Sequence, residues 1–477
     1  MSMTRWYRYI RDVKAFDRDE LVELIAEVSC DQMDKEQAAT TAGSQWEQQG
    51  VLLPFVLAGV ARDALLDGFS KAKRSPRSSD LERLCSQYLD LEDAVADPAA
   101  PYGSVARYMV RVAYEQFPYQ VSPFFELARS WALFADTAAQ VNAPTMTEEA
   151  WRRALRCGLD EYIWLAFAWH ASAATNRGWV DPGFQDPVQI HELRSSAEAL
   201  AAVSQRLSAS PNQLKQDPGI EVLPDNLRKY RYNPLLRRPF VRLGGRLLAP
   251  IQQLARRRTS PEGLYYDRVQ DPRFTDDLGD VFEAYIGRQL ATLENAGLAA
   301  VLPKIQFDRG NGREESIDWF VVFPDVVLLV EAKATRLAAE ARLGLDRLGP
   351  DVDRTLGVAY DQIGKTADLI RSGQPEFLDL PTDRPMLGLV VTLEPYWLLW
   401  HGTHPVEPEN IRVHPVSCGE IEAMVGAALV GPITDVFLRL TTESGTGGRR
   451  FVTAFEGKRS GANPILDAAY DRVFGVD

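Results

Sequence analysis

Residues 314–335 have the sequence EESIDWFVVFPDVVLLVEAKAT, and the fold of the surrounding chain depends on them. A short apolar run follows Asp318, and a second apolar run ends at Glu331-Ala-Lys333. The turn sequence Phe323-Pro-Asp325 separates the two runs. Two runs rich in β-formers that are joined by a Pro/Asp turn predict a β-hairpin.

Alternation along the second strand of this hairpin places charged side chains together. Because side chains alternate with period 2, Glu331 and Lys333 are expected on one face and Ala332 on the other. Asp318, on the partner strand, is expected near Glu331 on the same face. Charges leave water at a high cost unless they are paired or hold a metal. The hairpin therefore predicts a Mg²⁺ site.

The elements around the hairpin predict an α/β domain over residues 276–477. A helix with Glu283 is expected at 277–294 and a strand at 299–307, ahead of the hairpin. The elements expected after the hairpin are a helix at 353–370 that carries Gln362, strands at 387–393, 411–415 and 451–454, and helices at 419–429 and 464–473. This order predicts a central mixed sheet flanked by helices.

The same segments resemble the PD-(D/E)xK superfamily of restriction-endonuclease-like nucleases over about residues 276–420. The matching motifs are Gly279-Asp-Val-Phe-Glu283-Ala-Tyr, Ser316-Ile-Asp318 and Val330-Glu331-Ala-Lys333. Ile317 takes the position of the proline in the family name. The helix around Gln362 is only loosely similar to a glutamine-bearing helix of some relatives.

The resemblance implies metal-dependent hydrolysis of phosphodiester bonds. Mg²⁺ or Mn²⁺ would be held by Asp318, Glu331, the backbone carbonyl of Ala332 and Glu283. Oxygen ligands suit a hard cation, which stabilises developing negative charge and activates water. Lys333 would steer that water or contact the phosphate, and Gln362 completes the implied catalytic set. The alternative for Glu331 and Lys333 is an exposed ion pair at a strand end.

Residues 1–220 are expected to form a mostly α-helical domain. Apolar residues recur at helical spacing through most of this range, and Pro, Gly, Asn and Ser separate the helical stretches. The chain of 477 residues is too long for a single hydrophobic core, which supports a separate N-terminal domain. We expect this domain to sense a substrate, to bind a partner protein or to form a homo-oligomer.

Residues 221–275 are expected to form a basic linker with a small β-hairpin around Gly244-Gly245. Within it, residues 228–258 carry ten basic side chains and no acidic one, although the chain has a formal net charge of -13. The basic side chains predicted to contact nucleic acid are Arg237, Arg238, Arg242, Arg256, Arg257 and Arg258. Such a stretch suits phosphate contact. Ion pairs with acidic side chains of the helical domain are the equally weighted alternative.

The remaining composition predicts a soluble cytoplasmic protein. The four cysteines are far apart and have no CxxC spacing, so neither a zinc knuckle nor a disulfide framework is indicated. The first residues lack an apolar signal core, and no apolar run reaches the length of a membrane span.

Taken together, these features predict a Mg²⁺-dependent deoxyribonuclease. DNA is favoured over RNA by the resemblance, and a role in restriction or anti-phage defence is expected by the same analogy. The alternative is a catalytically inactive nuclease-fold protein that acts as a nucleic-acid-binding or assembly subunit. Metal binding separates the two, because a degenerate site would bind neither Mg²⁺ nor Mn²⁺.

Overall fold

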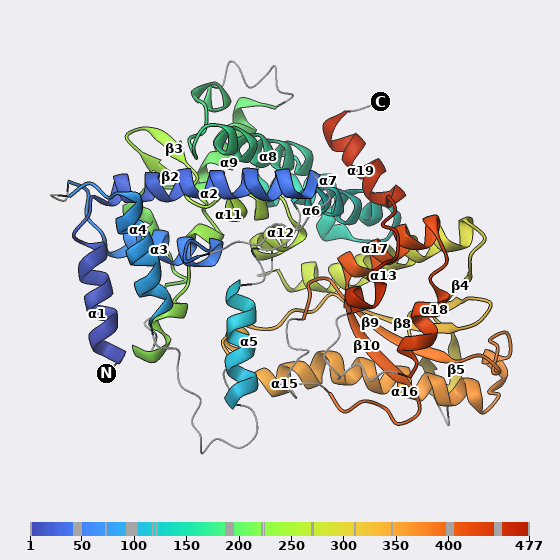
Figure 1. Cartoon of the computed structure of the whole chain (residues 1–477). Helices are drawn as coiled ribbons and strands as arrows, with labels where there is room; N and C mark the ends of the chain where they lie inside the picture. Colours follow the sequence, from blue (N-terminus) through green and yellow to red (C-terminus); the bar gives the residue numbers. More distant parts are fainter. Residues whose placement is uncertain are drawn as a thin grey trace. The chain divides into compact units, whose positions relative to one another are not determined.

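The computed structural model describes residues 2–41, 50–71, 74–91, 104–116, 119, 123–186, 195–220, 223, 225–268, 271–309, 312–344, 347–396, 405–442 and 451–475. The chain divides into two compact units, drawn in Figure 1. Unit 1 comprises Met1–Val95, Glu115–Ser130 and Thr147–Gln270, and unit 2 comprises Ala96–Tyr114, Trp131–Met146 and Asp271–Asp477.

Unit 1 is mostly helical. Its helices are α1 (Ser2–Val13), α2 (Arg18–Thr41), α3 (Pro54–Asp67), α4 (Ser78–Leu89), most of α6 (Pro123–Trp131), α7 (Glu148–Leu155), α8 (Leu159–Thr175), α9 (Ala197–Leu207), α10 (Pro211–Lys215), α11 (Gln252–Arg257) and α12 (Pro261–Arg268). Helix α3 packs against α1, α2 and α4, and its residues from Phe55 to Leu65 are all buried. A helix that is buried on all sides in this way belongs at the centre of a core.

The predicted small hairpin around Gly244-Gly245 is confirmed, but its surroundings are not those of a linker. Strands β2 (Phe240–Leu243) and β3 (Arg246–Leu248) pair antiparallel, and β1 (Ser208–Ala209) joins β2 in parallel. Both glycines have positive φ, as a tight hairpin turn requires. Residues 221–270 belong to unit 1, because apolar side chains such as Val241 and Leu254 are buried in its core.

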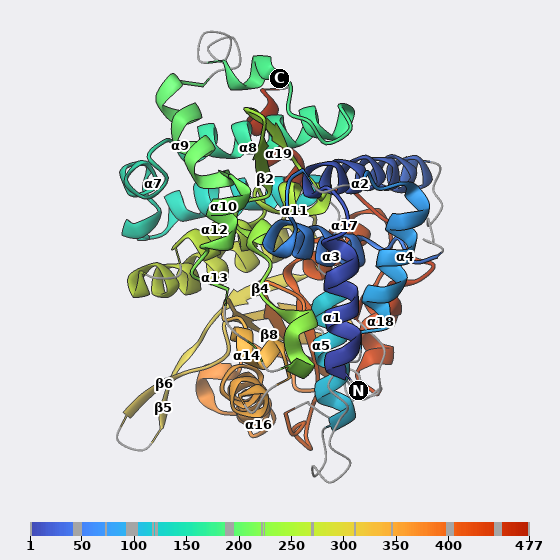
Figure 2. The same cartoon turned by 90° about the vertical axis from the view of Figure 1, so that its left-hand side faces the viewer.

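Unit 2 is built on a five-stranded mixed sheet with the strand order β10-β9-β8-β7-β4. The strands are β4 (Ala300–Pro303), β7 (Trp319–Val322), β8 (Val327–Lys333), β9 (Met386–Thr392) and β10 (Arg412–Ser417). β8, β9 and β10 are parallel to one another, whereas β7 is antiparallel to both of its neighbours. A separate hairpin of β5 (Gln306–Arg309) and β6 (Gly312–Glu315) stands away from this sheet in Figure 2.

Helices cover the five-stranded sheet of unit 2 from two sides. Figure 1 shows α16 (Val358–Arg371) on one side, and α13 (Pro272–Asn295) with α17 (Cys418–Val430) on the other. Val327 and Leu329 of β8 share a core with Tyr360 and Ile363 of α16. Since side chains alternate along a strand, Glu331 and Lys333 continue this face of β8.

The remaining elements of unit 2 are short. They include most of α5 (Ser104–Gln116), the π-helical turns η2 (Ala132–Thr137) and η9 (Asp353–Gly357), and the helices α14 (Ala339–Arg342), α15 (Leu348–Val352), α18 (Thr434–Leu440) and α19 (Pro464–Phe474). Within the described ranges, no helix combines the length and the apolar character needed to cross a membrane.

The predicted order of helices and strands in unit 2 is confirmed except at two places. The strand expected at 299–307 is divided into β4 and β5, which interrupts the sheet at Lys304-Ile305. The strand expected at 451–454 is wrong, because Phe451–Phe455 forms a 3-10 helix. The ring centres of Phe451 and Phe455 lie 5.1 Å apart, and Phe455 also contacts Phe437, so a helical turn packs the half-buried ring of Phe455 against the buried ring of Phe451.

Candidate active site

The hairpin predicted at residues 314–335 is present, and it brings Asp318 to Glu331. Strands β7 and β8 pair antiparallel with Trp319 opposite Val330. Asp318 precedes β7, and its Oδ2 accepts a hydrogen bond of 2.8 Å from the backbone N–H of Ala332. Asp318 is therefore held at the end of β8, next to Glu331.

Glu331 is a buried carboxylate that is only partly satisfied. Its exposed fraction is 2%. Its Oε1 lies 2.5 Å from Nζ of Lys333, whereas its Oε2 is buried and accepts no hydrogen bond from any residue that the structure describes. An unpaired buried carboxylate oxygen is costly to leave without a partner. This oxygen is the strongest indication that Glu331 meets a further ligand.

Gln362 on α16 is also brought to the site. Lys333 donates from Nζ to Oε1 of Gln362 across 3.3 Å. The ammonium group thus lies between the carboxylate of Glu331 and a neutral amide, so its position is fixed by two side chains. Four of the predicted residues, Asp318, Glu331, Lys333 and Gln362, lie together at one end of the sheet.

Glu283 on α13 approaches the site in company with a lysine. Its two carboxylate oxygens lie 3.0 and 3.1 Å from Nζ of Lys304, which follows β4. The indole N–H of Trp319 donates to the backbone carbonyl of Glu283 across 3.1 Å. The sequence carries no signal for Lys304, because a lone lysine between two strands has ordinary neighbours. Only the folded structure shows that Lys304 pairs with Glu283.

Burial raises the pKa of both central carboxyl groups, and neighbouring negative charge adds to the effect. Burial raises the pKa of Asp318 to about 7, and the adjacent charges of Glu331 and Glu283 act in the same direction. Burial also raises the pKa of Glu331, although the ammonium of Lys333 opposes the rise. Two carboxyl groups that resist ionisation side by side are typical of sites where a cation or a proton is shared.

The donor set fits a hard divalent cation. Asp318 and Glu331 offer carboxylate oxygens, which Mg²⁺ and Mn²⁺ prefer, and the free Oε2 of Glu331 provides a lone pair that no described residue uses. Among the described residues, no three His, Cys, Asp or Glu side chains form a ready metal-binding group. In the structure Glu283 is bound to Lys304 and Ala332 donates to Asp318, so a ligand role for either residue remains a prediction.

An open cavity of about 590 Å³ lies within unit 2 beside α13. Glu283, Lys304 and Trp319 line one part of it, and Arg288 and Gln140 line another. Because Asp318 directly precedes Trp319, the cavity and the carboxylate pair lie on connected elements. Charged and aromatic side chains are thus available near the candidate site.

The arginines of residues 228–258 have unequal access to solvent. Arg256 and Arg258 are buried, with exposed fractions of 9% and 2%. Arg258 lies 2.5 Å from Asp267, and Arg257 is half-buried in an ion pair with Glu262. Arg256 and Arg258 are therefore not presented to a polymer in this structure. Arg257 and Arg258 pair with Glu262 and Asp267, which lie within residues 221–275 and not in the helical residues 1–220 of the predicted alternative.

The other predicted arginines lie nearer the surface of unit 1. Arg237 is exposed and Arg238 is half-exposed. Arg242 is exposed and donates to the hydroxyl groups of Ser204 and Ser208. Contact between these three arginines and nucleic acid remains a prediction.

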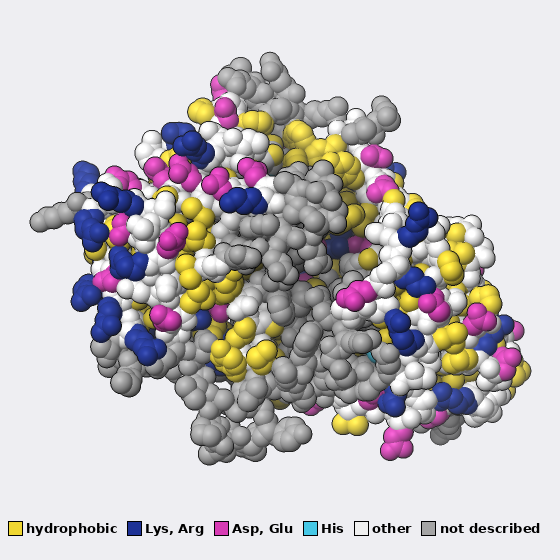
Figure 3. Space-filling model, viewed as in Figure 1, with side chains coloured by type: hydrophobic (Ala, Val, Ile, Leu, Met, Phe, Trp, Pro, Cys, Tyr) yellow, Lys and Arg dark blue, Asp and Glu magenta, His cyan; other side chains and the backbone are white. Residues whose placement is uncertain are grey.

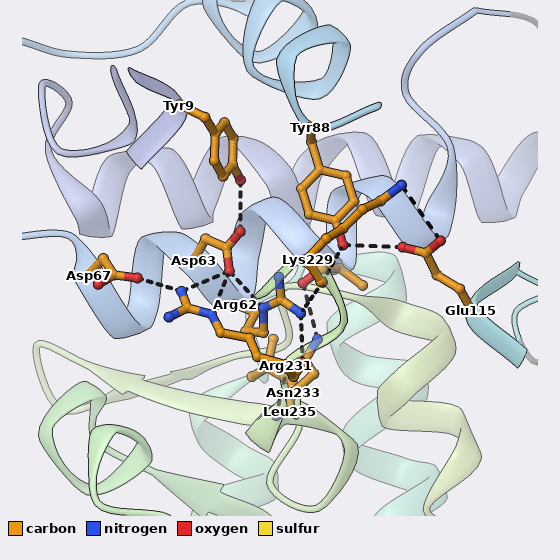
Figure 4. Close-up of polar contacts among 11 residues, drawn as sticks. Tyr9, Arg62, Asp63, Asp67, Tyr88, Glu115, Lys229, Arg231, Asn233 and Leu235 are labelled. Atoms are coloured by element: carbon orange, nitrogen blue, oxygen red, sulfur yellow. Dashed lines mark hydrogen bonds and ion pairs between the residues drawn. The ribbon is translucent and has the colours of Figure 1, made fainter. Parts of the chain in front are cut away.

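Neighbouring basic residues form an internal network, shown in Figure 4. Asp63 is fully buried and lies 2.9 Å from Arg231 and 3.0 Å from the hydroxyl of Tyr9. Arg62 donates to the backbone carbonyls of Lys229 and Arg231 at 3.0 and 2.8 Å. Removing one member of such a network would leave a buried charge without its partner. These residues therefore hold the segment before β2 against α3.

Comparison of this chain with protein-family models, with curated proteins and with solved structures finds no match. The interpretation of the site consequently depends on its own geometry and charge.

Proposed function

We propose that this chain is a divalent-metal-dependent nuclease that hydrolyses phosphodiester bonds, with DNA as the favoured substrate. The observation that carries the proposal is the buried, unpartnered Oε2 of Glu331 next to Asp318 and Lys333. Two carboxylates that can hold a cation and an ammonium group, all at one end of the sheet, meet the needs of phosphoryl chemistry.

Each side chain has a role that follows from its position. Asp318 and Glu331 would hold Mg²⁺, which when bound stabilises charge on the phosphate and activates water for attack. Lys333 would place its ammonium against a phosphate oxygen, since that group is already oriented by Glu331 and Gln362. Glu283 would keep the site electronegative while Lys304 limits the repulsion between the three carboxylates.

Calorimetric titration of Mg²⁺ and Mn²⁺ tests the metal site directly. We expect the wild-type chain to bind the ion, and the Asp318→Asn/Glu331→Gln variant to lose affinity by about 100-fold or more, because both carboxylate ligands become neutral. Asp325→Asn is the matched control, since Asp325 is exposed in the turn of the same hairpin. Circular dichroism checks that all three proteins are folded.

The outcomes separate the nuclease from a nuclease-fold assembly subunit. Metal binding that disappears only in the double variant, together with Mg²⁺-dependent cleavage of DNA, supports the enzyme. Equal titration curves for the wild type and the double variant would contradict the assignment of the site. Parallel assays with DNA and RNA identify the polymer that is cleaved.

A further inference from the structure

Helix α1 presents a row of basic side chains to solvent. Trp6, Tyr9, Ile10 and Val13 are buried in the core of unit 1. The opposite side carries exposed basic residues at every third position, namely Arg5, Arg8, Arg11 and Lys14. The helix is therefore amphipathic, but its apolar side is already occupied by the protein's own core.

A second basic segment adjoins this helix. The exposed basic residues of the segment are Lys71, Arg74, Arg77 and Arg83. The backbone N–H of Asp17 donates to the carbonyl of Arg74 across 2.9 Å, and Arg83 lies 3.1 Å from Asp12 of α1. We call the surface formed by these eight exposed side chains the α1 basic face. Figure 3 shows Lys and Arg side chains gathered at the left edge, where Figure 1 has α1 and α4.

The α1 basic face reverses the charge of the protein locally. Residues 5–18 and 71–83 contain ten basic and four acidic side chains, although the whole chain has a net charge of -13. Two of the acidic side chains, Asp12 and Asp80, are themselves paired with arginines of the face. An excess of positive charge on an acidic protein creates a local field that attracts anions.

Exposed aromatic rings lie at the border of the same face. Phe69 is 59% exposed, and Nζ of Lys14 and of Lys215 lie 5.9 and 5.8 Å from its ring centre. Tyr7 is 55% exposed, with the guanidinium of Arg228 at 5.6 Å. Aromatic rings among cations provide stacking surfaces for nucleic-acid bases beside contacts for phosphates.

We propose that the α1 basic face binds the phosphate backbone of DNA, an inference that rests on the proposed nuclease function. From Arg5 to Lys14 the helix rises about 14 Å, a length over which duplex DNA presents roughly eight phosphate charges. A membrane surface fits less well, because the apolar side of α1 is in the core and cannot enter lipid. The face therefore recruits the polymer by charge.

Fluorescence anisotropy with a labelled duplex measures this binding. The protein is the full chain carrying Asp318→Asn/Glu331→Gln, in EDTA, so that no cleavage occurs. Adding Arg8→Gln, Lys14→Gln and Arg77→Gln should weaken binding about tenfold or more, and should reduce the slope of log K against log[salt] by about 2 to 3.

The matched control removes the same charge elsewhere on unit 1. Arg152, Arg153 and Arg177 are exposed, and their replacement by Gln should leave both the affinity and the salt slope unchanged. No binding of the duplex by the parent chain, or an unchanged salt slope in the test variant, would overturn the proposal. Loss of binding to phosphatidylserine vesicles with unchanged DNA binding would overturn it in favour of a membrane surface.

This result is independent of the metal titration. If the duplex requires the α1 basic face but Asp318 and Glu331 bind no metal, then the DNA-binding surface stands and the nuclease assignment falls. If the metal site is confirmed but the test variant binds DNA normally, then the metal site stands and the proposed DNA-binding surface falls.

Discussion

Lys333 is held between the carboxylate of Glu331 and the amide of Gln362. Replacing Lys333 therefore tests the role of its positive charge without removing a metal ligand. Lys333→Ala is expected to reduce DNA cleavage by about 100-fold or more, because a preorganised ammonium stabilises charge that develops during the reaction. Binding of Mg²⁺ should change little, since Asp318 and Glu331 remain. Cleavage rates and calorimetry on the same variant check this. Near-normal cleavage by Lys333→Ala would remove Lys333 from the catalytic set.

Asp318 gives the protein a specific dependence of stability on pH. Its pKa is about 7 in the folded chain and near 4 when unfolded, so the folded state holds a proton that the unfolded state has lost between these values. The contribution of Asp318 to the free energy of unfolding is therefore full below about pH 4 and is lost as the pH rises through about 7.

The variant Asp318→Asn should not show this loss of stability with rising pH. Its side-chain oxygen still accepts from the N–H of Ala332, but no charge develops on it. Relative to the wild type, the variant should gain up to about 4 kcal/mol in unfolding free energy between pH 4 and pH 8. Urea unfolding without metal, followed by tryptophan fluorescence, measures the difference. A constant difference at both pH values would contradict the raised pKa.

At the level of single residues, the sequence could predict which side chains share the face of one hairpin. Glu331 and Lys333 are separated by one residue, so the alternation of a strand is sufficient. The burial of Arg258 and its pairing with Asp267 could not be predicted in this way. A run of arginines has the same sequence whether it faces solvent or a carboxylate inside the fold.

Helix α13 and strand β7 fit together at a glycine. A Cβ added at Gly287 would lie 2.2 Å from Cζ2 of Trp319. Gly287→Ala should therefore destabilise the protein by about 1–3 kcal/mol through overpacking, although alanine favours a helix. The displaced ring would also disturb Asp318, the adjacent residue, so metal affinity should fall in the same variant.

The same helix offers a matched control at Gly279, where an added Cβ would meet nothing within 4 Å. Gly279→Ala should stabilise by up to about 1 kcal/mol, because alanine has the higher helix propensity. Urea unfolding of both variants gives the comparison. Equal effects at the two glycines would show that the contact with Trp319 does not limit the packing of α13.

At the level of elements, local signals were sufficient where the chain carries its own start and stop. Helix α17 begins at Ser417, whose hydroxyl accepts from the N–H of Glu420 while the Glu420 carboxylate accepts from the N–H of Ser417. Such a capping box is visible in the sequence. Phe451–Phe455 carries no such signal, and its aromatic contacts with Phe437 decide its conformation.

At the scale of the whole molecule, the chain contributes N-terminal segments to unit 2. Trp131–Met146 belongs to this unit, where the backbone N–H and the hydroxyl of Thr145 donate to the carboxylate of Asp277 at 2.7 and 2.6 Å. Arg288 similarly donates to the hydroxyl of Thr137. The predicted boundary near residue 276 therefore lies close to the start of the largest segment of unit 2, Asp271–Asp477. The two smaller segments of this unit come earlier in the chain.

A fragment that comprises residues 271–477 should consequently fold poorly. It lacks the contact of Arg111 with the carbonyl of Leu343 as well as the ring of Phe134 against Phe274. We expect weak near-UV circular dichroism and binding of a hydrophobic dye, as in states without fixed side-chain packing. The full chain is the control. Cooperative unfolding of the fragment would show that the N-terminal segments are dispensable.

By itself, the sequence determined most helices and strands of unit 2, the hairpin at residues 314–335 and the alternation that joins Glu331 to Lys333. These features depend on side-chain periodicity and on turn residues, which act over a few positions along the chain. Only the tertiary structure brought Lys304 to Glu283 and Gln362 to Lys333, buried two of the predicted arginines and assembled unit 2 from separate segments. These outcomes depend on packing between residues far apart in the chain, which local patterns do not record.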